Sequence, residues 1–341
     1  MKAIACFHPL PVDHPESLQD IELPRPSPQG RDLLVRVLAV SVNPVDTKMR
    51  QAGSLTDQDE TPRVLGWDAA GVVEEIGTGV RFFQAGDEIY YSGSLVRPGC
   101  NSEFHLVDER IVGAKPTGWS MAQAAALPLT AITAYEALFD RLGIARDRQV
   151  NGQAILIIGG AGGVGSIAIQ IAKLAGLQVV ATASRPESKA WCKAMGADSV
   201  IDHTQPLSLQ LQALDCSNVG YILNTSSTEQ HWKAMAEVIK PQGRLCGIVN
   251  ANEPVDLNVF KQKSATFSWE FMFTRAMYET EDMIRQHELL NEVAGWIAEG
   301  HIQPTLTQTL SPITAANLRQ VHAKLEEGHM IGKLVLFDWP S

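Results

Sequence analysis

Hydrophobic and polar residues follow two different patterns along this chain. Before about residue 122, short apolar runs alternate with proline- and glycine-rich segments, as at 33–42, 69–76 and 87–91. Runs of this length between turn residues are typical of β-strands, and several in succession are typical of a small barrel or sandwich. The pattern therefore predicts a β-rich N-terminal third.

After residue 122 the pattern changes to apolar strands that alternate with amphipathic helices. Residues 154–158 are all apolar, as in a parallel strand buried on both faces, and the apolar positions of 164–175 recur with helical spacing. This alternation predicts a doubly wound α/β domain. The further predicted elements are strands at 178–183, 199–201, 220–223, 244–249, 265–269 and 333–337 and helices at 186–195, 231–239 and 281–299.

Length and composition are those of an ordinary globular protein. The chain has 341 residues, enough for about two domains, and 45% of them are hydrophobic and 19% charged. Its net charge of −10, without a cluster of Lys or Arg, argues against nucleic acid and anionic membranes as partners. The sequence contains neither a membrane-spanning stretch nor the apolar segment of a signal peptide, so we expect a cytoplasmic protein.

The cysteines give no sign of a disulfide framework or of a structural zinc site. Cys6, Cys100, Cys192, Cys216 and Cys246 are far apart in the sequence, without the closely spaced pairs that such sites use. We expect reduced, mostly buried thiols.

A glycine-rich segment gives the clearest functional signal. Residues 160–165 (GAGGVG) fit the pattern GxGxxG, directly after a predicted strand and at the start of a predicted helix. In this context glycines let the backbone approach a pyrophosphate, and the N–H groups of the helix start attract it. The pattern predicts a dinucleotide site. The alternatives are a tight turn without a ligand and an adenosylmethionine site, although no acidic residue directly precedes the glycines.

The end of the next predicted strand indicates which dinucleotide binds. NAD sites usually place Asp or Glu there to bind the ribose 2′-hydroxyl, whereas this chain has Ser184 and Arg185, with Lys189 one turn further on. A hydroxyl and two cations suit a 2′-phosphate, so we expect NADPH. The alternative is a pair of solvated cations at a helix start.

Five segments together resemble the medium-chain dehydrogenase/reductase superfamily: NPVDTKMR at 43–50, LGWDAAGVVEEIG at 65–77, LPLTAITAYEAL at 127–138, GGAGGVG at 159–165 and the terminal IGKLVL. Within it the chain resembles the quinone oxidoreductase branch, and 268–287 is similar to a subgroup called zinc-type alcohol dehydrogenase-like. The resemblance implies a GroES-like β-barrel catalytic domain, 1–127 with 299–341, and an inserted Rossmann domain at 128–298.

The residues at the expected metal positions argue against zinc. Where zinc-dependent members have a Cys ligand this chain has Asn43, and Gly66-Trp67-Asp68 replaces their His-bearing tripeptide. A catalytic zinc site needs three side-chain ligands, and an indole cannot be one. We therefore expect no metal.

The resemblance also implies a set of cofactor contacts. Gly162, Gly163, Val164 and Gly165 would face the pyrophosphate, and Ser184, Arg185 and Lys189 would bind the 2′-phosphate. The further implied contacts, for several of which simple packing or an exposed loop position is the alternative, are Thr133, His203, Thr225, Ile248, Phe271 and Lys333.

The resulting hypothesis is a zinc-independent, NADPH-dependent reductase of quinones or α,β-unsaturated carbonyls. Asn43 is the candidate donor to the substrate carbonyl, unless it only caps the turn before Pro44; Asp46 would orient the loop or the nicotinamide ribose, and Trp67 would form an apolar wall. The alternatives are a non-catalytic NADPH-binding or redox-sensing protein and an enoyl-thioester reductase. Because 265–269 would be an edge strand, we also expect a homodimer.

Overall fold

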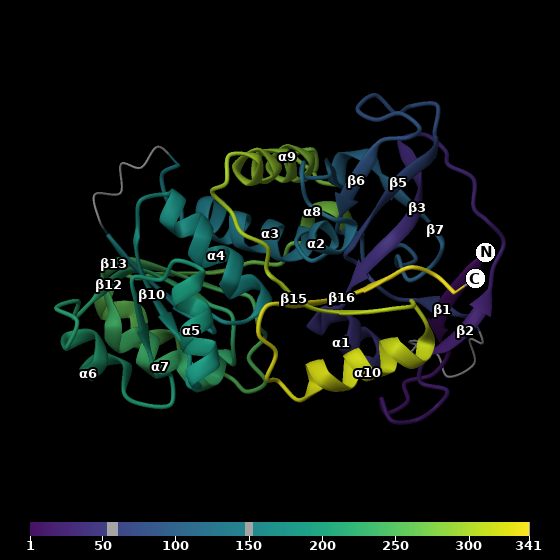
Figure 1. The fold of residues 1–341 in the computed structure, drawn as a ribbon. Helices are drawn as coiled ribbons and strands as arrows, with labels where there is room; N and C mark the ends of the chain where they lie inside the picture. The colour runs from purple at the N-terminus through teal and green to yellow at the C-terminus, as the bar shows by residue number, and fades with distance from the viewer. Residues whose placement is uncertain (53–60, 147–152, 341) are drawn as a thin grey trace. The chain divides into compact units, whose positions relative to one another are not determined.

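A computed structural model describes residues 1–52, 61–146 and 153–340. The chain forms two compact units, labelled by element in Figure 1. Unit 1 comprises Met1–Leu129, Phe273–Gly300 and Pro304–Ser341, and unit 2 comprises Thr130–Met272 and His301–Gln303. Within the described ranges, no helix combines the length and the apolar character needed to cross a bilayer.

Unit 1 is built on two β-sheets. The larger has the strand order β15-β16-β3-β5-β6-β8, with β7 also paired to β3, and the smaller has the order β2-β1-β4. The strands are β1 (Lys2–Cys6), β2 (Gln19–Glu22), β3 (Asp32–Ser41), β4 (Arg63–Val64), β5 (Ala69–Ile76), β6 (Glu88–Tyr91), β7 (Phe104–Asp108), β8 (Val112–Ala114), β15 (Leu306–Leu310) and β16 (Lys333–Phe337). The predicted β-rich N-terminal third is confirmed.

The long strand β3 organises the larger sheet. It pairs along one side with β5, while its first half pairs with β7 and its last residues pair with β16 on the other side. The antiparallel register sets Val335 opposite Ser41. Two irregularities in the β3–β5 register are of the kind that increases strand twist and curls a sheet. This curled sheet is the GroES-like part of the expected fold.

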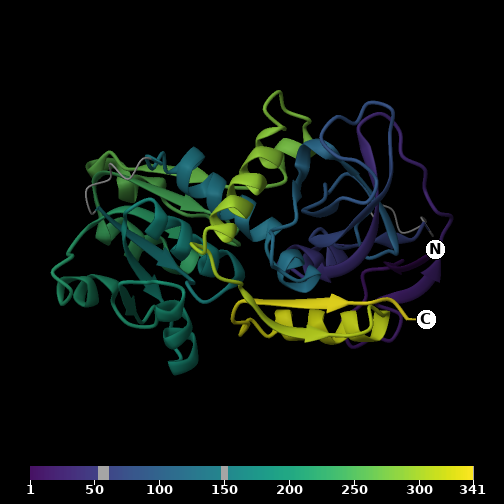
Figure 2. The same ribbon diagram turned by 45° about the horizontal axis from the view of Figure 1, so that its top comes forward.

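Helices flank these sheets. The element α10 lies along the C-terminal strands, as the yellow segments of Figure 2 show. Its N-cap is Thr314, whose side chain accepts a hydrogen bond from the backbone of Asn317. The helices of this unit are α1 (Pro44–Ala52), η1 (Glu109–Ile111), α2 (Met121–Ala125), α8 (Thr274–Met277), α9 (Arg285–Ala298) and α10 (Ala315–Glu326).

Unit 2 contains a six-stranded parallel sheet with the order β11-β10-β9-β12-β13-β14. The strands are β9 (Ala154–Ile158), β10 (Gln178–Thr182), β11 (Ser199–Ile201), β12 (Val219–Asn224), β13 (Ile239–Gly247) and β14 (Thr266–Trp269). The helices are η2 (Glu136–Arg141), α4 (Gly163–Leu174), α5 (Pro186–Ala194), α6 (Leu207–Gln212), α7 (Thr228–Val238) and η3 (Leu257–Lys263), and α3 (Pro128–Tyr135) continues from unit 1 into unit 2. The predicted doubly wound domain is confirmed.

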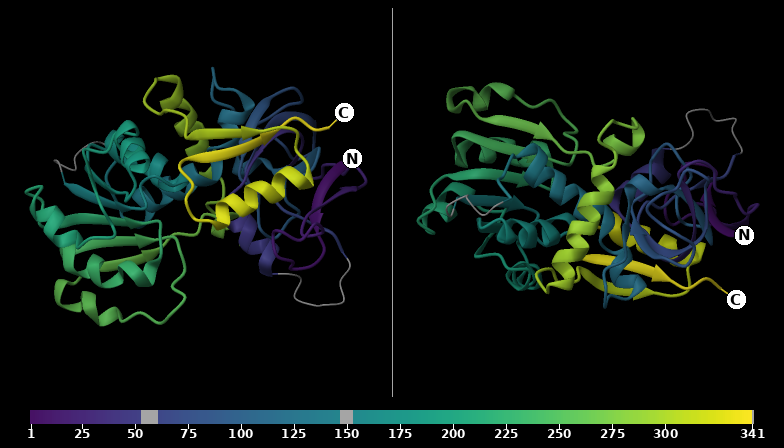
Figure 3. Two further views of the ribbon diagram at one scale, coloured as in Figure 1. Left: turned by 60° about the horizontal axis from the view of Figure 1, so that its bottom comes forward. Right: turned by 90° about the horizontal axis from the view of Figure 1, so that it is seen from above.

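Both faces of this sheet are covered, which explains the uninterrupted apolar run at 154–158. Leu156 and Ile158 pack in a cluster with Trp232 and Met235 of α7, so the alternate residues of β9 face the other side. All five side chains of β9 are buried. Figure 3 shows helices on both sides of the sheet, teal on one and green on the other.

Two segments differ from the sequence prediction. The helix expected at 281–299 begins at Arg285, because Asp282 accepts bonds from Arg275 and Thr280 that hold the preceding residues in a turn. Residues 273–298, expected with the Rossmann domain, lie in unit 1. Tyr90 Oη donates to the carbonyl of Leu290 at 2.6 Å, which ties α9 to β6.

Candidate functional site

The glycine loop between β9 and α4 has the geometry of a phosphate-binding turn. Gly159 has φ +83°, and a Cβ there would lie 2.5 Å from Thr225 Oγ1. A Cβ on Gly165 would lie 2.3 Å from the carbonyl oxygen of Gly159, so only glycine lets the helix approach the loop. By contrast, the nearest atom to a Cβ on Gly162 is 3.6 Å away. The loop is therefore closed on its protein side and open at Gly162.

The first turn of α4 leaves backbone donors for an anion. Gly162 is the N-cap and, lacking a side chain, makes no side-chain cap. The N–H groups of Gly163, Val164 and Gly165 lie in the first helical turn, where no intrahelical acceptor exists. They lie at the positive end of a helix of 12 residues. This arrangement can bind a pyrophosphate through the backbone alone.

The candidate 2′-phosphate residues lie together after β10. Arg185 is the N-cap of α5, and Lys189 lies one turn further, its N–H donating to the Arg185 carbonyl at 2.9 Å. Both side chains pair with acids of the same unit: Arg185 Nη1 with Glu187 at 3.3 Å, and Lys189 Nζ with Asp202 at 3.4 Å. A bound phosphate would replace these carboxylates as the partner of the two cations.

The other candidate cofactor residues of unit 2 follow neighbouring strands at the same edge of the sheet. His203 follows β11, Thr225 follows β12, Ile248 follows β13 and Phe271 follows β14. Carboxyl ends of parallel strands form the ligand-binding edge of such folds. Thr133, 5% exposed, lies instead in α3. The structure thus brings the strand-end candidates to one edge.

Thr225 has a structural contact that the sequence did not reveal. Its Oγ1 donates to the carbonyl of Ile158 at 2.8 Å and lies 3.2 Å from that of Gly159. The side chain of Thr182, which the sequence analysis missed, accepts from the N–H of Gly159 at 3.1 Å. Both residues hold the start of the glycine loop.

Unit 1 contains a buried polar cluster around Asn43. Its backbone N–H donates to Asp46 Oδ2 at 2.6 Å, and its Nδ2 donates to Asp68 Oδ2 at 3.0 Å. Lys333, the first residue of β16, donates from Nζ to Asn43 Oδ1, and also to Asp68 Oδ2 at 3.3 Å. Asp68 Oδ1 accepts the N–H of Leu129 at 3.0 Å. All four polar side chains are at most 4% exposed.

Asp68 was missed as a site residue in the sequence analysis. The sequence did contain a signal: Asp68 is an acidic residue within the apolar segment 65–73. A carboxylate buried in such a segment needs a hydrogen-bonding or charged partner. The partner is Lys333, a residue for which the family resemblance implies a cofactor contact. Here its ammonium faces Asn43 and Asp68.

Burial dominates the electrostatics of this cluster. Desolvation raises the pKa of Asp46 from 3.8 to about 7, against the bond from the Asn43 N–H and the charge of Lys333. Desolvation also raises the pKa of Asp68 and lowers that of Lys333, and each of these two charges partly offsets the shift of the other. Asp46 Oδ1 is buried and accepts no hydrogen bond from the described residues.

Trp67, the residue before Asp68, is fixed by two contacts within unit 1. Its Nε1–H donates to the carbonyl of Ser94 at 3.1 Å, and its ring meets Phe273 edge to face at 6.4 Å between centroids. The side chain is 2% exposed. The indole is therefore held from both sides.

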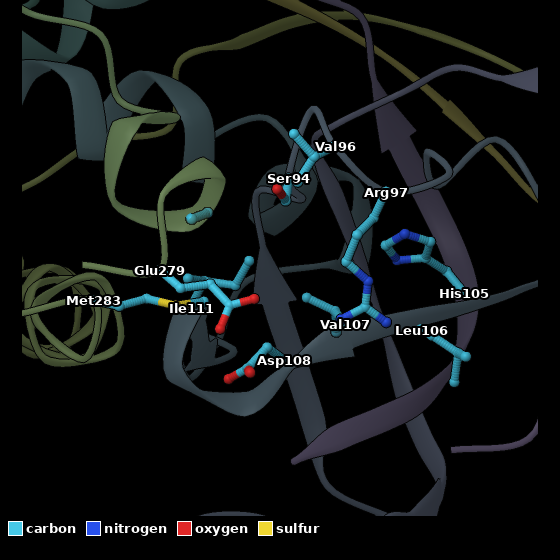
Figure 4. A pocket seen from close by; sticks show the side chains of 11 residues that line it. Ser94, Val96, Arg97, His105, Leu106, Val107, Asp108, Ile111, Glu279 and Met283 are labelled. Carbon is cyan, nitrogen blue, oxygen red and sulfur yellow. The ribbon is translucent and has the colours of Figure 1, made fainter. Parts of the chain in front are cut away.

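A separate pocket of about 250 Å³ lies in unit 1 next to Ser94 (Figure 4). Arg97 and His105 line one side, and Glu279 and Met283 line the other. His105 Nε2–H donates to the Pro98 carbonyl, so Nδ1 accepts the hydroxyl of Tyr91, and burial lowers the His105 pKa to about 4. Arg97 is paired with Asp32 at 2.8 Å. The pocket is thus lined by a neutral imidazole and by an arginine whose charge is paired with Asp32.

Comparison with known proteins defines the class. Residues 29–134 match the alcohol dehydrogenase GroES-like domain, and 195–336 match the zinc-binding dehydrogenase domain. A zinc-type alcohol dehydrogenase-like protein of Staphylococcus aureus (strain MRSA252) is 46% identical over 337 residues, 98% of this chain and 99% of the relative.

Two solved structures extend the comparison. One is a protein of Rhizobium etli CFN 42, provisionally assigned as a zinc-dependent alcohol dehydrogenase, with 49% sequence identity and a TM-score of 0.95. The match covers 100% of this chain and 99% of the Rhizobium chain. The quinone oxidoreductase of Coxiella burnetii is 26% identical with a TM-score of 0.81, covering 99% of both chains.

The fold and site define an oxidoreductase with a nicotinamide cofactor. The chain belongs to the medium-chain dehydrogenase/reductase superfamily, with zinc-type alcohol dehydrogenase-like proteins and quinone oxidoreductases among its relatives.

The buried cluster does not fit the zinc that the family names imply. Trp67 offers no ligand atom, and the oxygens of Asn43 and Asp68 that could bind a metal accept hydrogen bonds from the Lys333 ammonium. The Lys333 ammonium already lies among these acceptor oxygens and would repel a metal cation. Within the described ranges, no three or more His, Cys, Asp or Glu side chains gather as a metal site.

Proposed function

We propose that this protein is a zinc-independent reductase that uses NADPH to reduce quinones or α,β-unsaturated carbonyls. The observation that carries the proposal is the Lys333 ammonium among the oxygens of Asn43 and Asp68, where a catalytic metal would need free ligands. Hydride transfer to an isolated ketone concentrates charge on one oxygen, which a Lewis acid stabilises well. A conjugated acceptor spreads that charge as an enolate or a hydroquinonate.

The proposed cofactor contacts follow from unit 2. The N–H groups of the first turn of α4 would bind the pyrophosphate, and Ser184, Arg185 and Lys189 the 2′-phosphate. Thr133, His203, Thr225, Ile248 and Phe271 would line the remainder of the cofactor. When bound, the nicotinamide supplies a hydride.

The proposed contribution of unit 1 is to orient the acceptor. Asn43 Nδ2 donates to Asp68, and its second hydrogen has only a long contact, 3.5 Å, to the Ser41 carbonyl. A substrate carbonyl can replace that long contact and accept the hydrogen. Trp67 would exclude water as an apolar wall, Asp46 holds the Asn43 backbone, and solvent would supply the proton.

The functional protein is proposed to be a homodimer. Strand β14 is the last in the sheet of unit 2, and its Trp269 is 48% exposed. An unpaired edge of this kind can join a second copy across a two-fold axis.

A panel of electron acceptors tests the proposal. Consumption of NADPH is measured with an ortho-quinone, a short enone and an enoyl-CoA. We expect turnover with the first two. Binding of NADPH without turnover of any acceptor would favour a non-catalytic role, and turnover of the thioester alone an enoyl-thioester reductase.

A further inference from the structure

The Lys333 side chain is enclosed by oxygen acceptors from another part of unit 1. Its Nζ donates to the carbonyl of Val42 at 3.1 Å, to Asn43 Oδ1, and to Asp68 Oδ2 at 3.3 Å. Lys333 is 4% exposed, and the Asp68 side chain is fully buried. The strand register explains the placement: because Val335 faces Ser41, Lys333 comes opposite residue 43.

The number of acceptors matches the chemistry of an ammonium group. An ammonium has three N–H donors and no acceptor, and three oxygens surround this one. They are a backbone carbonyl, a carboxamide and a carboxylate, which are the ligand types that hard cations prefer. A second carboxylate, that of Asp46, adds to the negative potential at Lys333.

The oxygens are held in place independently of Lys333. Asp68 Oδ1 accepts the N–H of Leu129 at 3.0 Å, and the Asn43 amide is tied to Asp68 through Nδ2. The backbone of Asn43 is fixed by its bond to Asp46. The cradle would therefore persist if the lysine were shortened.

We propose that Val42 O, Asn43 Oδ1 and Asp68 Oδ2 form a preformed cation site whose built-in occupant is the ammonium of Lys333. In this site Lys333 neutralises Asp68 and donates to the Asn43 oxygen, while the bond from Asn43 Nδ2 to Asp68 sets the direction of the amide. This inference goes beyond the proposed function and does not depend on it, since it concerns binding in the absence of NADPH and substrate.

Replacing the occupant from solution tests the proposal. Lys333→Ala removes the atoms of n-propylammonium, so n-propylammonium chloride is the probe, with 1-propanol as the neutral probe of similar shape. The control is Lys48→Ala, the same substitution at an exposed position of α1. Calorimetric titration and thermal unfolding are measured for both variants and for the unmodified protein.

The expected result is saturable binding of n-propylammonium by Lys333→Ala alone, at least tenfold tighter than 1-propanol, with a concentration-dependent rise in its Tm. Binding no tighter than in Lys48→Ala, or equal binding of 1-propanol, would overturn the proposal. This selectivity for charge separates a cation site from a cavity that any small molecule fills.

A second pair of variants covers the case in which Lys333→Ala does not fold. Lys333→Met leaves Asp68 buried without its cation, whereas Lys333→Met with Asp68→Asn removes both charges. We expect the double variant to unfold at a higher temperature than Lys333→Met. An equal or lower Tm of the double variant would show that charge compensation does not hold this site together.

Discussion

The carboxamide of Asn43 donates from Nδ2 to the carboxylate of Asp68 at 3.0 Å, although one residue follows β3 and the other precedes β5. Because Asp68 accepts there, the Asn43 oxygen must face Lys333. The direction of the amide is thus set by a network within unit 1. Its long contact to the Ser41 carbonyl is the one that we propose a substrate displaces.

Replacing Asn43 tests its proposed role as the donor to the substrate. Asn43→Ala should lower turnover of an ortho-quinone by about 10–1000-fold if the amide stabilises the developing oxyanion. The backbone bond from residue 43 to Asp46 is retained in this variant, so a mere turn-capping role predicts almost unchanged turnover. Steady-state rates, with Tm as the check on folding, distinguish the two.

The cations after β10 predict the preference for NADPH. Arg185→Asp should weaken NADPH binding by about 1.5–3 kcal/mol, the value of a charge-assisted hydrogen bond, and leave NADH binding almost unchanged. Lys193→Asp, the same charge change at an exposed position of α5, is the control. Titration with each cofactor measures the effect, and equal affinities of the unmodified protein for NADPH and NADH would contradict the assignment.

The Arg185–Glu187 ion pair leads to a prediction in the opposite direction, a variant that binds NADPH more tightly. Glu187 holds Arg185 at 3.3 Å in the structure, and both side chains are partly exposed. Glu187→Gln removes the competing carboxylate and should tighten NADPH binding without affecting NADH. A weaker affinity for NADPH in this variant would show that Glu187 orients Arg185 instead.

Asp46 predicts a specific dependence of stability on pH. Its pKa is raised in the folded protein to about 7, so the folded state binds a proton that the unfolded state loses near its ordinary value of 3.8. Its contribution to stability is therefore full below pH 4 and decreases as the pH rises towards 7. The loss is about 4 kcal/mol for a shift of roughly three pKa units.

The variant Asp46→Asn isolates this contribution, because an amide does not titrate. The free energy of unfolding, measured by denaturant between pH 4 and 8, should fall more steeply with pH in the unmodified protein than in the variant. Parallel pH profiles would exclude a raised Asp46 pKa. The comparison isolates Asp46 because its charged or titratable neighbours are the same in both proteins. These neighbours are Lys333, Asp68 and Cys100.

Much of the fold was predictable because its signals are local. The apolar run of β9 and the glycines after it occupy one short segment, and the structure confirms both the strand and the helix start there. The contact of Lys333 with Asp68 spans 265 positions and depends on the register of β16 against β3. No periodicity in the sequence specifies such a register, which is why the contact of Lys333 with Asp68 could not be predicted.

The exposed edge of unit 2 predicts the assembly. Trp269→Glu places a charge on the face of β14 and should convert a dimer to a monomer in light scattering at micromolar concentration. Val96→Glu, a substitution at an exposed apolar residue of unit 1, is the control and should remain dimeric. A monomeric mass for the unmodified protein would contradict the proposed dimer.

The most direct test of metal-independent reduction is the rate of NADPH oxidation by protein dialysed against a chelator and shown by elemental analysis to lack zinc. With an ortho-quinone or a short enone, we expect the same turnover before and after dialysis and negligible oxidation of ethanol or benzyl alcohol with NADP⁺. About one zinc per chain before dialysis, with activity lost on its removal, or efficient alcohol oxidation by the zinc-free protein, would contradict the account.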